Sequence, residues 1–198
     1  MTMAFVELFE ISTLDPDKSD DVLILAASWE ERCLGAARRL RNYSCKKIIL
    51  SIYDGASKLR EKHIGELTSI LTPLGDLIRL PALHNNPLPN VRATIKEVRD
   101  VTRGRKPSIT IDLTTFTRKH LLQLLQGLDM AGLLGNSRFL HTEASDYDTH
   151  DNEAMAEGIS EVKAIEAFSG SNTPSRDSLL IVFLGYEGRR ALALWEHL

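Results

Sequence analysis

The sequence predicts an α/β protein, a three-layer sandwich in which helices cover both faces of a mainly parallel sheet. Strand-like and helix-like segments alternate at least four times along the 198 residues. The strand-like segments are short aliphatic runs, which are typical of parallel strands buried on both faces. Strands and helices in this order are joined by right-handed crossovers within one parallel sheet. The predicted fold is therefore a Rossmann-like sandwich.

Each predicted element rests on its hydrophobic pattern and on the residues that end it. The run DVLILAA is continuously apolar, as is KKIILSIYD, and the second run ends at Asp54 and Gly55. Helical spacing of apolar residues predicts the intervening segments, the second of which is closed by Pro73 and Gly75. The predicted elements of this first half are a strand at 21–27, a helix at 30–43, a strand at 46–54 and a helix at 57–75.

The second half continues the alternation of predicted strands and helices, and polar connecting segments then interrupt it. Asn90 is expected to cap the third helix, because its side chain is a preferred N-cap acceptor. A polar loop over 145–158 and a linker over 169–177 separate the later segments. The predicted elements are strands at 76–83, 107–113 and 137–144, helices at 90–103 and 117–131, an edge strand at 159–168 and a strand–helix unit at 178–198.

The last unit repeats a feature of the first. ILAASWEERCLG over 24–35 and VFLGYEGRRALA over 182–193 both place an aromatic residue, Glu and Arg behind an apolar run. We expect a Rossmann-like domain over 1–170, then a linker and terminal strand–helix unit over 171–198 that begins a second repeat. This repeated pattern slightly favours a chain that is a fragment of a longer protein or a separated subunit. The alternative is that the last unit completes the first sheet.

Net charge, cysteine content and the length of the apolar runs indicate which kinds of binding partner to expect. The formal charge of −3 argues against binding nucleic acid through bulk charge, although it leaves room for a small anion in a local basic pocket. Cys33 and Cys45 form no metal spacing, which favours a reduced, cytoplasmic protein. The first residues lack a signal-peptide pattern, and no apolar run is long enough to span a bilayer. We therefore expect no membrane partner.

The segment DLTTFTRKH over 112–120 is the most informative candidate site. Ligands of open parallel sheets bind beyond the carboxyl ends of the strands, where the strand order reverses. Thr114, Thr115 and Thr117 bring hydroxyls and backbone amides to a helix start, where the helix dipole favours an anion. Arg118 adds positive charge. Asp112 either orients the loop or accepts from a ribose hydroxyl, and a simple helix-capping role for the threonines stays open.

The segment SWEER over 28–32 is the expected neighbour of that loop. It has no G-x-G-x-x-G, so it does not predict a pyrophosphate held against the backbone. Trp29 either stacks on a base or covers the sheet edge, and Ser28 belongs to the same loop. Glu30 and Arg32 are secondary candidates. The corresponding residues of the repeated pattern over 182–193 are secondary candidates as well: Tyr186, Glu187 and Arg189.

No metal site, cofactor or catalytic motif is predicted. The acidic loop from His141 to Asp151 has no zinc or calcium spacing, and a solvated loop is the better interpretation. The histidines at 63, 84, 120 and 197 have no partner at ligand spacing. No nucleophile elbow or Walker loop is present.

The segment SITIDLTTFTRKHLLQLL resembles the signature of CARF domains, the Rossmann-like sensors of CRISPR ancillary proteins. Asp112, Thr114, Thr115 and Arg118 fall on that pattern of an acid or amide ending the fourth strand, a hydroxyl residue and a basic helix start. The resemblance covers the order of elements over about the first 145 residues, whereas its specific motif is under ten residues long.

The resemblance implies a function and a partner. In the family this loop and the loop after the first strand contact a cyclic oligonucleotide, commonly across a homodimer interface. The implied positions in the first loop are Ala27, Ser28 and Trp29. The sequence departs from the family in TTFT, which replaces a glycine-containing loop, and Phe116 there changes how closely a phosphate can approach.

Three functions follow from these observations. The leading one is a ligand-sensing module for a nucleotide-type molecule in prokaryotic antiviral defence, in a homodimer or a larger defence complex. The second is a nucleoside- or nucleotide-processing transferase or hydrolase, with Glu30 or Glu187 as nucleophile or base and Asp112 as its orienter. The third is a non-catalytic assembly subunit that docks through the apolar last helix, residues Leu192, Leu194, Trp195 and Leu198.

Overall fold

The computed structural model describes residues 19–40, 42–144, 164–166 and 168, and the account below concerns these. The chain divides into two compact units, Met1–Ala144 and Ser145–Leu198. The predicted domain boundary at residue 170 stays a prediction. The terminal strand–helix unit over 178–198 lies outside the described residues. Within the strand expected at 159–168, Glu166 and Phe168 instead lie in a turn, and the Phe168 amide donates to the Ile165 carbonyl at 2.9 Å.

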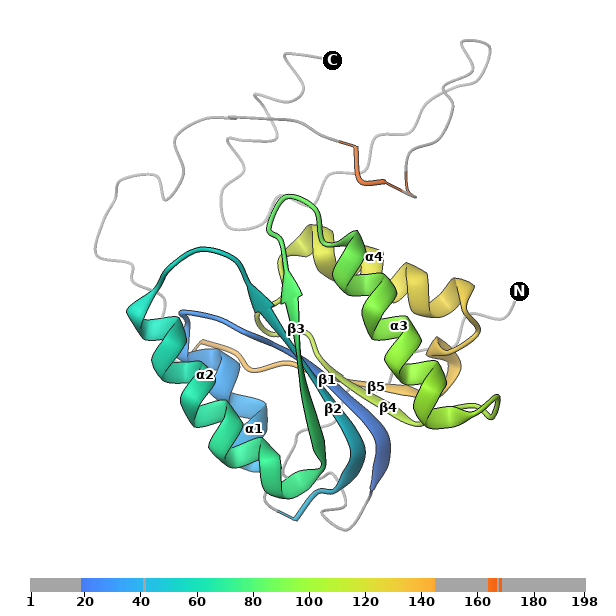
Figure 1. The fold of residues 1–198 in the computed structure, drawn as a ribbon, viewed down its shortest axis with the longest axis horizontal. Helices are drawn as coiled ribbons and strands as arrows, with labels where there is room; N and C mark the ends of the chain where they lie inside the picture. Colours follow the sequence, from blue (N-terminus) through green and yellow to red (C-terminus); the bar gives the residue numbers. More distant parts are fainter. Residues whose placement is uncertain (1–18, 41, 145–163, 167, 169–198) are drawn as a thin grey trace. The chain divides into compact units, whose positions relative to one another are not determined.

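The first unit contains a five-stranded sheet in which every pairing is parallel (Figure 1). The spatial order is β3-β2-β1-β4-β5, so β1 lies at the centre and the strand order reverses between β1 and β4. The predicted α/β fold class is confirmed. The strands are β1 (Asp20–Ala27), β2 (Cys45–Tyr53), β3 (Asp76–Ala82), β4 (Ile109–Asp112) and β5 (Ser137–Leu140).

Helices cover both faces of this sheet, with α1 and α2 on one face and α3 and α4 on the other (Figure 1). None of the described helices is long and apolar enough to cross a membrane. The helices are α1 (Gly35–Arg39), α2 (Lys58–Leu71), α3 (Leu88–Thr102) and α4 (Arg118–Met130), with short 3₁₀ turns η2 (Glu31–Leu34), η3 (Thr72–Leu74) and η4 (Leu134–Asn136).

The central strand shows why the aliphatic runs predict this architecture. All eight residues of β1 are buried. Because successive side chains of a strand point to opposite faces, alternate residues of β1 enter different cores. Leu23 and Leu25 pack in the core beneath α1 and α2, whereas Val22 and Ile24 pack in the core beneath α3 and α4. Beyond the two buried acids at its amino end, Asp20 and Asp21, a strand that serves two cores is therefore apolar on both faces.

The first predicted helix is wrong in extent. In place of one helix over 30–43, the chain forms η2, then the short α1, and leaves helical geometry at Leu40. Tertiary contacts explain the early stop. Tyr43 is buried and donates its hydroxyl to Asp20 at 2.9 Å, which draws the chain back to the sheet at the point where a longer helix would continue.

The predicted cap of the third helix is also wrong. Helix α3 begins at Leu88 after Pro87, so Asn90 lies inside its first turn. The buried Asn90 amide donates instead to the carbonyls of Pro81 at 3.0 Å and Leu80 at 3.3 Å, and its oxygen accepts from the Ser51 hydroxyl at 3.1 Å. Asn90 therefore joins α3 to β2 and β3. The strands β4 and β5 are shorter than expected, because residues beyond Asp112 and Leu140 turn away to form loops.

Candidate functional site

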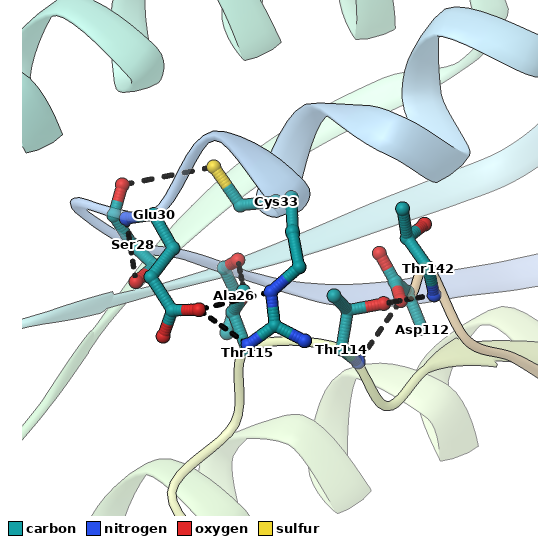
Figure 2. Close-up of polar contacts among 9 residues, drawn as sticks. Ala26, Ser28, Glu30, Cys33, Asp112, Thr114, Thr115 and Thr142 are labelled. Atoms are coloured by element: carbon teal, nitrogen blue, oxygen red, sulfur yellow. Dashed lines mark hydrogen bonds and ion pairs between the residues drawn. The ribbon is translucent and has the colours of Figure 1, made fainter. Parts of the chain in front are cut away.

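The loops after β1 and β4 meet at the carboxyl edge of the sheet, where the strand order reverses (Figure 2). The Thr115 hydroxyl donates to the carbonyl of Ala26 at 2.7 Å, which links the two loops across 89 residues of sequence. Strands that are parallel neighbours end at the same edge, so the candidate residues after β1 and β4 are brought together as expected. This point is where open α/β sheets bind ligands.

Asp112 and Thr114 form the base of the β4–α4 loop. One Asp112 carboxylate oxygen accepts from the Thr114 amide at 3.0 Å and from the Thr114 hydroxyl. The same hydroxyl accepts from the Thr142 amide at 2.9 Å, beyond the end of β5 (Figure 2). Burial raises the pKa of the Asp112 carboxyl, and the hydrogen bonds from Thr114 oppose that shift. Asp112 therefore orients the loop, which is one of its two predicted roles.

Thr117 caps α4, because its hydroxyl accepts from the His120 amide at 3.3 Å. The Thr117 amide donates to the Tyr53 hydroxyl at 2.9 Å, and that hydroxyl also lies 2.9 Å from Nδ1 of His120. Burial lowers the pKa of His120 to about 4, so this imidazole is neutral near pH 7. Tyr53 and His120 thus hold the first turn of α4 in place through these hydrogen bonds.

The hydroxyls of Thr114 and Thr115 donate within the protein, to Asp112 and to the Ala26 carbonyl, whereas the Thr117 hydroxyl accepts in its cap bond and keeps its own proton. The groups that can still donate to a ligand at this helix start are therefore the first amides of α4, the Thr117 hydroxyl and the side chain of Arg118. The first N–H groups of a helix have no intrahelical acceptor, and the helix dipole makes their position favourable for an anion. Arg118 is exposed at the first position of α4.

The loop after β1 presents one large aromatic side chain and a paired charge. Trp29 is 63% exposed, so it does not cover the sheet edge in the described part of the chain. Ser28 accepts from the Glu30 amide at 3.2 Å. Arg32 Nε donates to the Glu30 carboxylate at 3.0 Å, which partly neutralises both side chains. Neither Glu30 nor Arg32 stands as a free charge beside the loop.

A second polar group at this edge was missed by the sequence reasoning. Asp54 follows β2 and His84 follows β3, and Nδ1 of His84 lies 2.7 Å from the Asp54 carboxylate. A usable signal was present, since Asp54 ends one predicted strand and His84 directly follows the next predicted strand along the chain. The 30-residue separation between them hid the pairing.

Three secondary candidates lie outside the described residues: Tyr186, Glu187 and Arg189. Among the residues that the structure describes, no three His, Cys, Asp or Glu side chains converge in a way that could hold a metal ion.

The opposite, amino edge of the sheet carries a wide hollow of about 470 Å³ lined by Asp20, Asp21, Lys46, Arg105 and neighbouring residues. The charged side chains that line it form ion pairs and hydrogen bonds with one another. Asp21 accepts from Arg105 Nη1 at 2.7 Å and from the Ser108 amide at 3.0 Å, and Lys46 lies 3.0 Å away. Because its acids and bases are paired, the hollow is better explained as a stabilising ionic network than as a binding site.

No protein-family model matches the chain, and no curated protein matches its sequence significantly. Fold and edge geometry therefore define the class: an α/β protein with a Rossmann-like sandwich and a polar carboxyl edge at the reversal of strand order.

Proposed function

We propose that residues 19–144 form a sensing module that binds a nucleotide-type ligand at the carboxyl edge between β1 and β4. The observation that carries this proposal is the junction of the two loops at the reversal of strand order, joined by the hydrogen bond from Thr115 to Ala26. Ligands of doubly wound sheets bind at this place. The loop after β1 carries the exposed Trp29 and the loop after β4 leads into α4, so the proposed site combines an aromatic side chain with a helix start.

The phosphate and the base of a nucleotide each have a counterpart in this arrangement. The amides at the start of α4 and the Arg118 guanidinium suit a phosphate. The exposed Trp29 ring suits stacking on a base, which contributes about 1–3 kcal/mol per base in nucleic-acid complexes. Asp112, Thr114 and Thr115 hold the loop in shape, and the Thr117 hydroxyl can donate to a phosphate oxygen.

The biological setting rests on the CARF resemblance alone. It includes a cyclic oligonucleotide as the ligand, a homodimer or larger defence complex, and a role in prokaryotic antiviral defence within the cytoplasm. Docking through the last helix is a separate proposal about residues outside the described part. Catalysis by Glu30 is less favoured, because Arg32 already pairs with its carboxylate.

Thermal-shift measurements with cyclic and linear mono- and oligonucleotides test the binding proposal. A ligand at 100 times its Kd stabilises the folded state by about 2.7 kcal/mol. Arg118→Gln should weaken binding about tenfold or more, because a hydrogen bond to a charged group contributes about 1.5–3 kcal/mol. Arg99→Gln is the matched control, since Arg99 is exposed in the last turn of α3. No shift with any nucleotide, or equal loss in both variants, would count against the proposal.

A further inference from the structure

Asp54 and His84 form a polar pair outside the junction of β1 and β4. One Asp54 oxygen accepts from the backbone amide of His84 at 3.0 Å and from Nδ1 of its ring at 2.7 Å. Both bonds come from the same residue, so the imidazole is fixed at its backbone and at one ring nitrogen.

The backbone around this pair is fixed as well. The Asp54 amide donates to the Ala82 carbonyl at 2.9 Å, which extends the pairing of β2 with β3 by one residue. Arg60, which is buried, donates from Nη1 to the Asp54 carbonyl at 2.9 Å. The His84 ring packs against Tyr53 with centroids 4.6 Å apart. The pair is therefore held from several sides, although its side chains are 50% and 53% exposed.

The geometry determines which nitrogen of His84 carries the proton. Hydrogen bonds from His84 lower the pKa of Asp54, so its carboxylate is ionised and only accepts. Nδ1 must then donate. In the neutral imidazole the lone pair lies on Nε2. No described residue hydrogen-bonds to Nε2, and half of the side chain faces solvent. A fixed imidazole with an available Nε2 is the arrangement that general bases use.

The pair lies beside the start of α4. The Tyr53 ring that packs on His84 carries the hydroxyl that accepts from the Thr117 amide at 2.9 Å. Asn85, the residue after His84, accepts at its carbonyl from Lys119 Nζ at 3.0 Å. One tyrosine ring thus separates His84 from the helix terminus at which we place a phosphate.

We propose that His84, oriented by Asp54, is the general base of a hydrolytic site for phosphate esters. Nε2 takes a proton from water while the water oxygen forms a bond to phosphorus. The phosphorus–oxygen bond to the leaving alcohol breaks on the opposite side, the leaving oxygen takes a proton from solvent water, and Nε2 returns its proton to solvent. Water is the only co-reactant, and the products are an alcohol and a phosphate with one ester bond fewer. The position of the phosphate rests on the function proposed above.

Two chromogenic esters test this proposal on the full chain: p-nitrophenyl phosphate for monoesters and bis(p-nitrophenyl) phosphate for diesters. We expect wild-type protein to release p-nitrophenol above the buffer rate from at least one ester. His84→Asn should lower kcat by about 10²–10⁴, the usual contribution of a general base. Asp54→Asn should lower kcat by at least tenfold, because the asparagine no longer holds the His84 imidazole in the tautomer that carries its proton on Nδ1. The control is Asp100→Asn, which changes an exposed carboxylate near the end of α3 and should keep full activity.

Chemical rescue separates loss of the base from loss of the fold. Free imidazole should restore part of the kcat of His84→Ala, whereas it should not affect Asp54→Asn in the same way. Hydrolysis that survives His84→Asn unchanged, or no wild-type hydrolysis of either ester, overturns the proposal. Nucleotide binding by thermal shift is measured in parallel. Binding without hydrolysis leaves the sensing function intact and removes only the catalytic one.

Discussion

At the scale of single residues, the amino end of β1 carries two adjacent acids with different partners. Asp20 and Asp21 are both 6% exposed. Asp20 accepts from Tyr43, Thr110 and Arg138, which join the sheet from β2 to β5. Asp21 instead accepts from Arg105 and the loop before β4. Buried carboxylates are tolerated only with such partners, so these two side chains tie the amino ends of the strands together.

The Asp21 carboxylate makes the stability of the fold depend on pH. Arg105 chiefly, with Ser108 and Lys46, holds its pKa well below the usual range. A group with a depressed folded pKa stabilises the protein above its unfolded pKa of about 3.9, and this contribution is lost as the pH falls below that value. Asp21→Asn should therefore lower the free energy of unfolding by about 2 kcal/mol at pH 7. The difference from wild type should shrink below pH about 4.

Urea denaturation of both chains at several pH values measures this difference. Glu31→Gln is the control, because Glu31 pairs with Arg38 at an exposed position where an ion pair contributes little. A difference between wild type and Asp21→Asn that stays constant from neutral to acid pH would contradict the assignment.

At the scale of elements, two glycines differ in what a side chain would meet. A Cβ on Gly75, just before β3, would lie 2.4 Å from the carbonyl oxygen of Cys45 at the start of β2. That atom belongs to the backbone of a neighbouring strand and cannot move freely. A Cβ on Gly65, on the exposed side of α2, would meet nothing within 4 Å. The same substitution should thus have opposite effects.

Gly75→Ala should destabilise the protein by about 1–3 kcal/mol, because it overpacks the contact between β2 and β3. Gly65→Ala should stabilise it by about 0.5–1 kcal/mol, since alanine is the better helix former and the site is open. Paired thermal melts measure both effects, and each acts as the control of the other. Equal shifts in the same direction would show that the close approach at Gly75 does not constrain the fold.

At this scale the sequence predicts the existence and order of elements better than their ends. Aliphatic runs locate β1 and β2 most clearly, because a central strand buried on both faces is apolar over most of its length, whereas the mixed segments of β3 and β5 give a weaker pattern. The early end of α1 depends on the distant contact between Tyr43 and Asp20, and the position of Asn90 depends on the carbonyls of β3. Local propensity carries no information about such partners.

At the scale of the whole molecule, β1 is the axis of the described sheet. It pairs with β2 on one side and β4 on the other, and its side chains enter both cores. The outer strands β3 and β5 have a neighbouring strand on one side, and β3 is partly exposed along its length. Cooperative stability should therefore decrease from the centre of the sheet to its edges.

Native-state hydrogen exchange measures this gradient. The amides of Leu23, Ile24 and Leu25 should exchange only through global unfolding, because no smaller opening exposes the central strand. Amides of β3 and β5 should exchange through local openings with a lower free energy. Protection at β3 equal to that of β1 would contradict the gradient.

The sequence by itself determined the fold class and indicated the edge of the sheet at which the candidate site lies. Parallel strands with continuous apolar runs need helices on both faces, and their carboxyl ends collect the polar residues that follow them. Only the tertiary structure decided which of those residues meet across the sheet. The Thr115 hydroxyl donates to the Ala26 carbonyl across 89 residues of sequence, and Asp54 pairs with His84 across the neighbouring strands β2 and β3. Pairings of this kind depend on strand order and side-chain direction, which distance along the chain does not encode.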